Sequence, residues 1–243
     1  MYKFLTIALI FFSLIHVSNA SDLIQLNKNT FDELQAIEFE SVDTGYAEFL
    51  SKDLEIFTSN DENFIIGIYQ SKVGSEIIDE PYPYNEYMYI LEGEVLTKTV
   101  DGHNHIYRVG ESFMIPKGWM GDFAITKDFL IIYAVDGINE TENVDANYIV
   151  KINDARVFQY ELGDFEEYSP GESDLTARDL TFFSNKNETF QIGLWESSAG
   201  SVSGSETFHE FMYPLKGSII LTNKNGEQLI TNPGEGILVP SGW

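Results

Sequence analysis

The chain has no cysteine among its 243 residues, and this absence excludes several kinds of structure and chemistry. Disulfide bonds, thiolate nucleophiles and a lipid anchor attached through an N-terminal cysteine are all impossible. Histidine is scarce as well, with four copies in the whole sequence. The carboxylates are therefore the better candidates for any functional site.

Basic residues are also few, with 14 Lys and Arg against 39 Asp and Glu, which gives a formal net charge of −25. A negatively charged surface repels phosphate groups, so we do not expect nucleic acid or anionic membranes as partners. The charge fits either solubility outside the cell or an affinity for cations. The composition leaves both interpretations open.

No hydrophobic run is long enough to span a bilayer, which takes roughly 20 residues. The run from Phe4 to Val17 is shorter; it follows Lys3 and precedes small residues that end at Ala20. This pattern predicts a signal peptide over residues 1–20, with a secreted or periplasmic mature chain that begins at Ser21. We expect no membrane association after cleavage, and an uncleaved anchor is the alternative.

The strongest positive signal is an internal repeat. The segment from Leu54 to Ser71 reappears as Leu180 to Ser197, at an offset of 126 residues. Two residues then drop out of the second copy, and an offset of 124 relates the later matches: Glu86 with Glu210, Gly93 with Gly217, Gly110 with Gly234, Pro116 with Pro240 and Trp119 with Trp243. The repeat predicts two consecutive domains of one fold.

Each copy has the pattern of consecutive β-strands. Residues from Glu86 to Val95 are rich in aromatic and branched side chains, which favour strands. Asp101-Gly102 in the first copy and Asn225-Gly226 in the second predict tight hairpin turns. A short helix is expected near the start of the mature chain, where Thr30 and Glu33 have the spacing of a capping box.

The repeat also predicts the domain limits. Residues 21–145 are expected to form the first domain with an N-terminal extension, and residues 146–243 the second. The boundary lies near residues 139–147, where the composition becomes polar, and the polar stretch 164–174 is expected to be a loop.

The second copy is shorter than the first. After Trp119 the first copy continues into an apolar run from Phe129 to Val135, whereas the second copy stops at Trp243. We therefore expect the second domain to be incomplete, either because the sequence is a fragment of a longer protein or because its last barrel is open, with unpaired strand edges.

These motifs resemble those of the cupin superfamily. Glu86 followed by six residues and Gly93 resembles the end of the first cupin motif, and Gly110 followed by five residues and Pro116 resembles the start of the second. The second copy repeats both motifs. The resemblance covers nearly all of residues 50–243 and implies an all-β fold of tandem cupin (double-stranded β-helix, or jelly-roll) barrels, the second of them truncated. The residue sequences of both motifs resemble those of the cupin branch that includes ureidoglycine aminohydrolase.

The histidines of a metal-binding cupin are absent from both motifs. The resemblance places two histidines six and four residues before the motif glutamate, where this chain has Glu80 and Tyr82. A third belongs five residues after Pro116, where Gly121 stands. The second copy has Gly204 and Glu206 at the first two positions. We therefore expect degenerate metal sites and favour no cofactor.

The other histidines of the mature chain are weak candidates for metal ligands. His103 and His105 lie at the tip of the predicted hairpin, away from the motif glutamate. His209 adjoins Glu210, and neighbours on a strand face opposite sides of the sheet, so His209 is expected to point outward.

The alternation of side chains in a barrel predicts a pocket in each copy. If Glu86 points inward, Met88 and Ile90 do too, and the intervening Tyr87 and Tyr89 then form an outer row that suits pairing into a homodimer. The candidate ligand-pocket residues are Glu80, Tyr82, Glu86, Met88 and Trp119 in the first copy and Glu206, Glu210 and Met212 in the second. Trp119 fits either a pocket mouth or ordinary core packing.

Several functions remain open at this stage, and so does the question of whether the protein is an enzyme. The favoured interpretation is a module that binds a small-molecule ligand or has a structural role. The alternative that the resemblance implies is a Mn-dependent aminohydrolase acting on a small ureido or amide compound. In that case Glu80, Glu86, Glu206 and Glu210 would hold the divalent metal. A third is a metal-free enzyme with Glu86 or Glu210 as acid or base.

Overall fold

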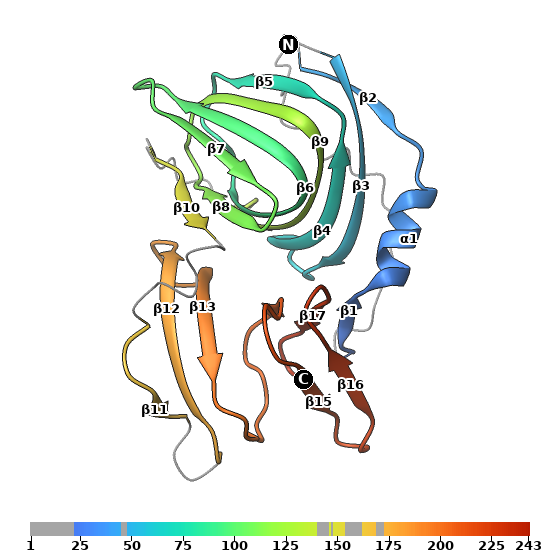
Figure 1. Ribbon diagram of the computed structural model, residues 1–243, viewed down its shortest axis with the longest axis vertical. Coiled ribbons are helices and arrows are strands. Elements are labelled where there is room, and N and C mark those ends of the chain that lie inside the picture. Colours follow the sequence, from blue (N-terminus) through green and yellow to red (C-terminus); the bar gives the residue numbers. More distant parts are fainter. Residues whose placement is uncertain (1–21, 45–47, 140–145, 147, 154–161, 169–172) are drawn as a thin grey trace. The chain divides into compact units, whose positions relative to one another are not determined.

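The computed structural model describes residues 22–44, 48–139, 146, 148–153, 162–168 and 173–243. Within these ranges the chain forms many β-strands and one short α-helix, which confirms the all-β prediction (Figure 1). The predicted signal peptide and most of the predicted domain boundary lie outside the described residues. The described part contains no helix with the length and apolar character needed to cross a membrane.

The described chain divides into two compact units by its internal contacts. The first unit runs from Phe39 to Ser203 and contains the whole first copy of the repeat together with the start of the second. The second unit joins the N-terminal residues up to Glu38 with the segment from Gly204 to Trp243. Each unit has its own strands.

The first unit is built on a nine-stranded sheet that curls around an apolar interior (Figure 1). Its neighbouring strands are, in order, β10 (Val150–Asn153), β8 (Glu111–Ile115), β6 (Asn85–Thr99), β9 (Gly121–Asp136), β4 (Phe64–Ser71), β3 (Glu48–Thr58) and β2 (Glu40–Asp43). In addition, β5 (Gly74–Ile78) pairs with β9, and β7 (Asn104–Arg108) pairs with β6. These pairings give the cupin barrel its wall.

The two longest strands, β6 and β9, pair along most of their length. The run from Phe129 to Asp136 is buried throughout because β9 lies between β4 and β6 and is covered on both faces. On β6 the predicted alternation holds. Glu86, Met88 and Ile90 are buried, whereas Tyr87 and Tyr89 are half-buried on the other side.

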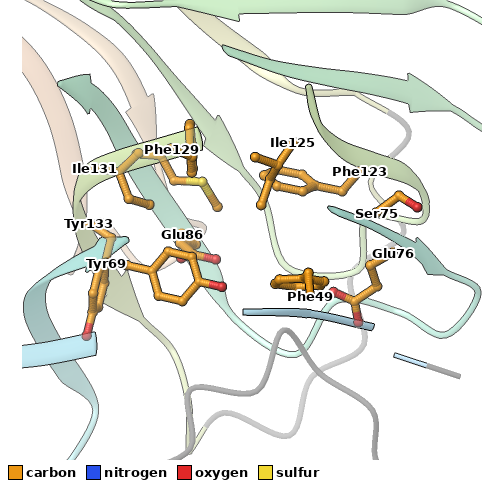
Figure 2. A pocket seen from close by; sticks show the side chains of 11 residues that line it. Phe49, Tyr69, Ser75, Glu76, Glu86, Phe123, Ile125, Phe129, Ile131 and Tyr133 are labelled. Atoms are coloured by element: carbon orange, nitrogen blue, oxygen red, sulfur yellow. The ribbon is translucent and has the colours of Figure 1, made fainter. Parts of the chain in front are cut away.

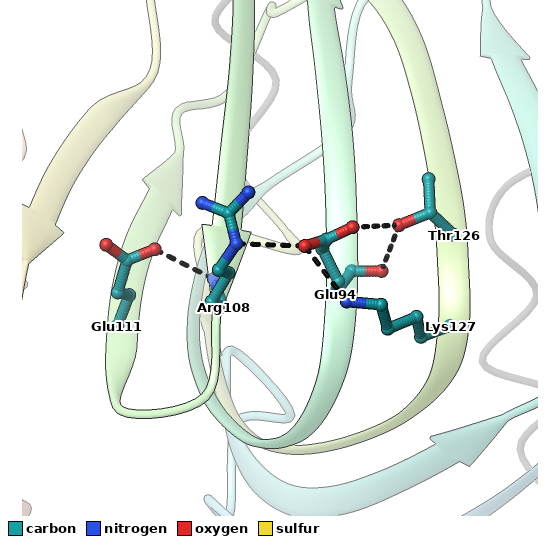
Figure 3. Close-up of polar contacts among 5 residues, drawn as sticks. All are labelled: Glu94, Arg108, Glu111, Thr126 and Lys127. Carbon is teal, nitrogen blue, oxygen red and sulfur yellow. Dashed lines mark hydrogen bonds and ion pairs between the residues drawn. The ribbon is translucent and has the colours of Figure 1, made fainter.

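A cluster of polar and charged side chains links three strands on the outside of this barrel (Figure 3). The Glu94 carboxylate of β6 accepts hydrogen bonds from the Thr126 hydroxyl at 2.9 Å and from the Lys127 ammonium at 3.3 Å, and it pairs with the Arg108 guanidinium at 2.9 Å. These bonds lower the pKa of Glu94, so the side chain stays ionised. The cluster lies where the β6–β9 register shifts near Glu94, and it links β6 to β7 and β9 there.

The internal repeat extends to irregular features of the backbone. The β3–β4 pair has a bulge between Glu55 and Phe57, and the pair formed by β12 (Thr176–Ser184) and β13 (Gln191–Ser197) has one between Thr181 and Phe183. The turns that follow contain Glu62 and Glu188, with positive φ angles of 56° and 57°. Bulges and left-handed residues seldom coincide by chance, so the two copies share one local fold.

The predicted hairpin turns are confirmed in both copies. The Gly102 amide donates to the Thr99 carbonyl at 2.8 Å, and the Gly226 amide donates to the Asn223 carbonyl at 2.9 Å. The first turn joins β6 to β7. The second joins β15 (Ile219–Thr222) to β16 (Gln228–Thr231).

The second unit combines the two ends of the described chain. Its three-stranded sheet has the order β1 (Ile24–Leu26), β17 (Gly236–Val239) and β14 (Glu210–Met212). Strand β1 pairs with β17 in antiparallel register, so the N-terminal extension, which the sequence groups with the first copy, supplies a strand to the second. The helix α1 (Lys28–Ala36) follows β1 directly.

Two local predictions need correction. The N-cap of α1 is Asn27 and not Thr30, because the Asn27 side chain accepts from the Asn29 amide while the Thr30 hydroxyl accepts from the Asn27 amide. The stretch 164–174 is not all loop in its described part. It contains the two-residue strand β11 (Glu166–Glu167), which pairs with β12.

The sharpest steric constraint on the first barrel lies at Gly93, where φ is 91°. A Cβ atom there would come within 2.1 Å of the backbone oxygen of Asp128. We expect Gly93→Ala to destabilise the fold by about 3 kcal/mol or more, since it combines a disfavoured backbone conformation with a clash against the main chain. Urea denaturation measures the loss.

Gly102→Ala is the matched control, because its φ is 89° and a Cβ there would meet nothing within 4 Å. It should cost only about 1–2 kcal/mol. Equal losses at the two sites would contradict the assigned close approach between Gly93 and Asp128.

Candidate functional site

The interior of the first barrel holds a small cavity (Figure 2). Its volume is about 20 Å³, enough for a water molecule and too small for a metabolite. The side chains that line it are Phe49, Tyr69, Ser75, Glu76, Glu86, Met88, Phe123, Ile125, Phe129, Ile131 and Tyr133. The cavity therefore leaves little free space beside its two carboxyl groups.

The motif glutamate, Glu86, lies inside this barrel on β6 and is 5% exposed. The Tyr82 hydroxyl donates a hydrogen bond to Glu86 Oε2. Burial raises the pKa of Glu86 to about 7, although the bond from Tyr82 pulls it down. Near neutral pH the carboxyl is thus divided between its two protonation states.

Two further carboxyl groups, Glu76 and Asp53, lie close enough to act on Glu86 electrostatically. Glu76 on β5 is 3% exposed, and its Oε2 atom has no hydrogen-bond partner among the described residues. Asp53 on β3 is partly exposed as a residue, and its Oδ2 atom accepts a hydrogen bond from the Tyr133 hydroxyl at 3.1 Å. Burial raises the pKa of each to about 7. The charges of both also raise the pKa of Glu86.

The rest of the cavity wall is aromatic and aliphatic. The pKa of Tyr69 and that of Tyr133 are raised by burial, so both hydroxyls stay protonated and can donate. Of the described residues that line the cavity, none is lysine, arginine or histidine. The lining therefore offers carboxyls, phenols and ring faces with no positive charge to balance them.

The structure brings together only part of the residue set predicted for the first pocket. Glu86 and Met88 line the cavity, and Tyr82 is buried and bonded to Glu86. Trp119 is fully buried in the hydrophobic core and does not line the cavity, which decides for core packing. Glu80 is exposed, because β5 ends at Ile78 and the alternation of β6 does not extend back to residue 80.

Tyr82 also holds the turn that carries the second cupin motif. Its amide donates to the Trp119 carbonyl at 3.0 Å, and the Gly118 amide donates to the Tyr82 carbonyl at 2.7 Å. In the second copy the Glu206 amide donates to the Trp243 carbonyl at 3.0 Å, and the Gly242 amide donates to the Glu206 carbonyl at 2.8 Å. The backbone bonds are conserved between copies, while the side chain at this position changes from phenol to carboxylate.

The second copy brings Glu206 and Glu210 close enough to interact. Both are half-buried, as is Met212. Burial and the nearby charge of Glu206 raise the pKa of Glu210. Because Glu206 replaces the tyrosine, Glu210 faces a second acid there in place of a phenol.

His209 has a structural role. Its Nδ1 atom accepts a hydrogen bond from the Ser241 amide at 3.1 Å, just as Asn85 Oδ1 accepts from the Lys117 amide at 3.0 Å in the first copy. His103 pairs with Asp101 at 2.9 Å on the exposed hairpin.

The residues at the metal-ligand positions do not fit a histidine-type metal centre. Glu80 is exposed, Tyr82 is engaged with Glu86, and Gly121 has no side chain and lies against the Trp119 ring. Over the whole described part of the chain, no three His, Cys, Asp or Glu side chains are placed to hold a metal ion.

Sequence reasoning missed Glu76 and Asp53. A signal for Glu76 is its spacing of two from Ile78, which puts both on the buried face of β5. No comparable signal marks Asp53, whose position depends on how β3 pairs with β4.

Fold and site together define a double cupin without the usual histidines, and the sequence matches the Cupin_3 family, the EutQ-like cupin domain, over residues 58–130 and 184–243. These segments make up more than half of the chain, which therefore belongs to this cupin family. No curated protein matches.

Two solved structures are similar in fold. One is a protein of unknown function of the DUF861 family from Pseudomonas syringae, 19% identical, with a TM-score of 0.67 over 91% of this chain and 92% of that one. The other is a cupin 2 conserved barrel domain protein from Leptotrichia buccalis, 14% identical, with a TM-score of 0.50 over 90% and 86% of the two chains. At these identities they show the fold alone.

The raised pKa values predict that stability falls as the pH rises. Asp53, Glu76 and Glu86 hold their protons to about pH 7 when folded, against ordinary values of 3.8 to 4.5, so the folded state binds more protons between these limits. Their stabilising contribution is complete below about pH 4 and is lost as the pH passes 7, on the order of 3–4 kcal/mol for each carboxyl at most. Urea denaturation between pH 4.5 and 8 measures the slope.

Glu86→Gln should flatten this slope, because the amide does not ionise. Glu80→Gln removes the same charge from an exposed position and should leave the slope close to that of the unaltered protein. A slope that Glu86→Gln leaves unchanged would contradict the raised pKa of Glu86.

Proposed function

We propose that this chain is a secreted or periplasmic double cupin whose first barrel binds a small molecule at Glu86 without a histidine-held metal. One observation carries the proposal: two buried carboxyls, Glu76 and Glu86, face one cavity inside an otherwise apolar barrel. Burying an acid without a full set of partners lowers the stability of the fold. A barrel with a purely structural role would be more stable with apolar side chains there, so the acids indicate binding.

A ligand larger than a water molecule requires the lining side chains to move. Ser75 is exposed and also lines the cavity, next to Glu76 in the sequence. Figure 2 draws Ser75, Glu76 and Phe49 toward one side of the cavity, with Tyr69 and Tyr133 toward the other. We place the entry beside Ser75, where the Phe49 ring is the side chain to displace.

A second candidate is an aminohydrolase related to ureidoglycine aminohydrolase that acts on a small ureido or amide compound. The residue sequences of the two cupin motifs support this function, and a Glu86 pKa near 7 suits a group that takes and returns a proton at neutral pH. The exposed Glu80 and the engaged Tyr82 weaken its Mn-dependent form. A metal-free version would use Glu86 as the acid or base.

The binding proposal is tested with urea, acetamide, methylammonium and acetate as probes in a thermal-shift assay. We expect at least one probe to raise the melting temperature of the unaltered protein and of Glu80→Gln, and to lose this effect in Glu86→Gln. Ammonia release from urea or acetamide would support the aminohydrolase. If every probe leaves the melting temperature unchanged, the first barrel has a structural role and the binding proposal fails.

A further inference from the structure

We infer that the ligand of the first barrel is a small alkylammonium cation, whose charged head lies between Glu76 and Glu86 against the aromatic wall of the cavity. The inference rests on the binding function proposed above and narrows it to one chemical class. Three features of the cavity support a cation of this kind: its charge, its aromatic lining and its size.

The charge of the cavity favours a cation. Glu76 and Glu86 both line it, and Asp53 is near enough for its charge to affect Glu86. The described lining contains no basic side chain that could neutralise them. Glu76, a residue that is 3% exposed, has an Oε2 atom with no hydrogen-bond donor among the described residues, and an ammonium N–H supplies both the donor and the charge.

The aromatic wall distinguishes an organic cation from a metal ion. Five of the lining side chains carry rings, namely Phe49, Tyr69, Phe123, Phe129 and Tyr133. Ring faces attract alkylammonium groups through their quadrupoles, whereas a divalent metal needs several oxygen or nitrogen ligands. The described residues do not bring three such acidic or histidine ligands together. An anion would be repelled by the carboxylates.

The size of the cavity limits the head group. A volume of about 20 Å³ accommodates an ammonium group, which is similar in size to water. The alkyl part extends toward the Phe49 ring. This ring packs directly against Gly74, because a Cβ atom on Gly74 would lie 2.5 Å from it. A primary ammonium with a short alkyl chain therefore fits better than a bulky quaternary one.

Binding should depend on pH, because the cation prefers ionised carboxylates. The titratable groups that act on the site come from several strands and the loop before β6: Asp53, Glu55, Tyr69, Glu76, Tyr82, Tyr84, Glu86 and Tyr133. The tyrosines among these groups stay neutral between pH 6 and pH 8, so the carboxyls control the pH dependence of binding. Methylammonium keeps its charge from pH 6 to pH 8, and its affinity should rise about tenfold or more over that interval.

The test follows the methyl resonance of Met88, which lines the cavity, by NMR of the full chain without its predicted signal. The resonance is assigned with Met88→Leu. Methylammonium, methanol, acetamide and acetate are titrated separately at constant ionic strength. We expect methylammonium alone to shift the resonance saturably, with an affinity reduced about tenfold in Glu76→Gln and unchanged in Glu80→Gln.

The outcomes separate this inference from the proposed function. A shift by methanol or acetamide as large as that by methylammonium would overturn the cation and leave small-molecule binding in place. No shift with any probe would overturn both. An equal affinity of methylammonium for Glu76→Gln and the unaltered protein would also overturn the inference. The comparison among probes needs no variant, so it holds even if Glu76→Gln fails to fold.

Discussion

A carboxyl group that is buried away from water must either interact with a hydrogen-bond donor or a cation, or remain protonated. In the first barrel Glu86 finds the Tyr82 hydroxyl, and the backbone of Tyr82 at the same time closes the turn that ends in Trp119. One residue thus fixes both the motif glutamate and the motif turn. In the second copy Glu206 makes the same backbone bonds but adds a negative charge beside Glu210, so the two sites differ in chemistry while sharing a frame.

The strand order converts this local arrangement into a site. Strand β9 pairs with β4, β5 and β6, so it joins the strands that carry Tyr69, Glu76 and Glu86 around one interior. Asp53 comes from β3, one strand farther along. No strand contributes more than one of these acids. The acidic, aromatic interior is therefore a property of the closed barrel and not of any single motif.

The sequence predicts the fold well because its evidence is periodic. The repeat locates the bulges and turns of the second copy from those of the first, and alternation along β6 correctly places Glu86, Met88 and Ile90 inside. The site is less predictable. Glu80 is exposed because alternation stops where the strand stops, and Glu76 and Asp53 reach Glu86 through pairings between distant strands that no local pattern encodes. Likewise, the N-terminal strand pairs with β17 across nearly the whole sequence.

The central claim is that the Tyr82 hydroxyl and the neighbouring carboxyls occupy the place of a metal centre in the first barrel. Metal content measured by mass spectrometry tests it most directly, after the protein has been dialysed with Mn, Zn, Fe and Ca and then washed. We expect the protein to retain no ion whose binding depends on Glu86. One ion per chain that is lost in Glu86→Gln and kept in Glu210→Gln would contradict it.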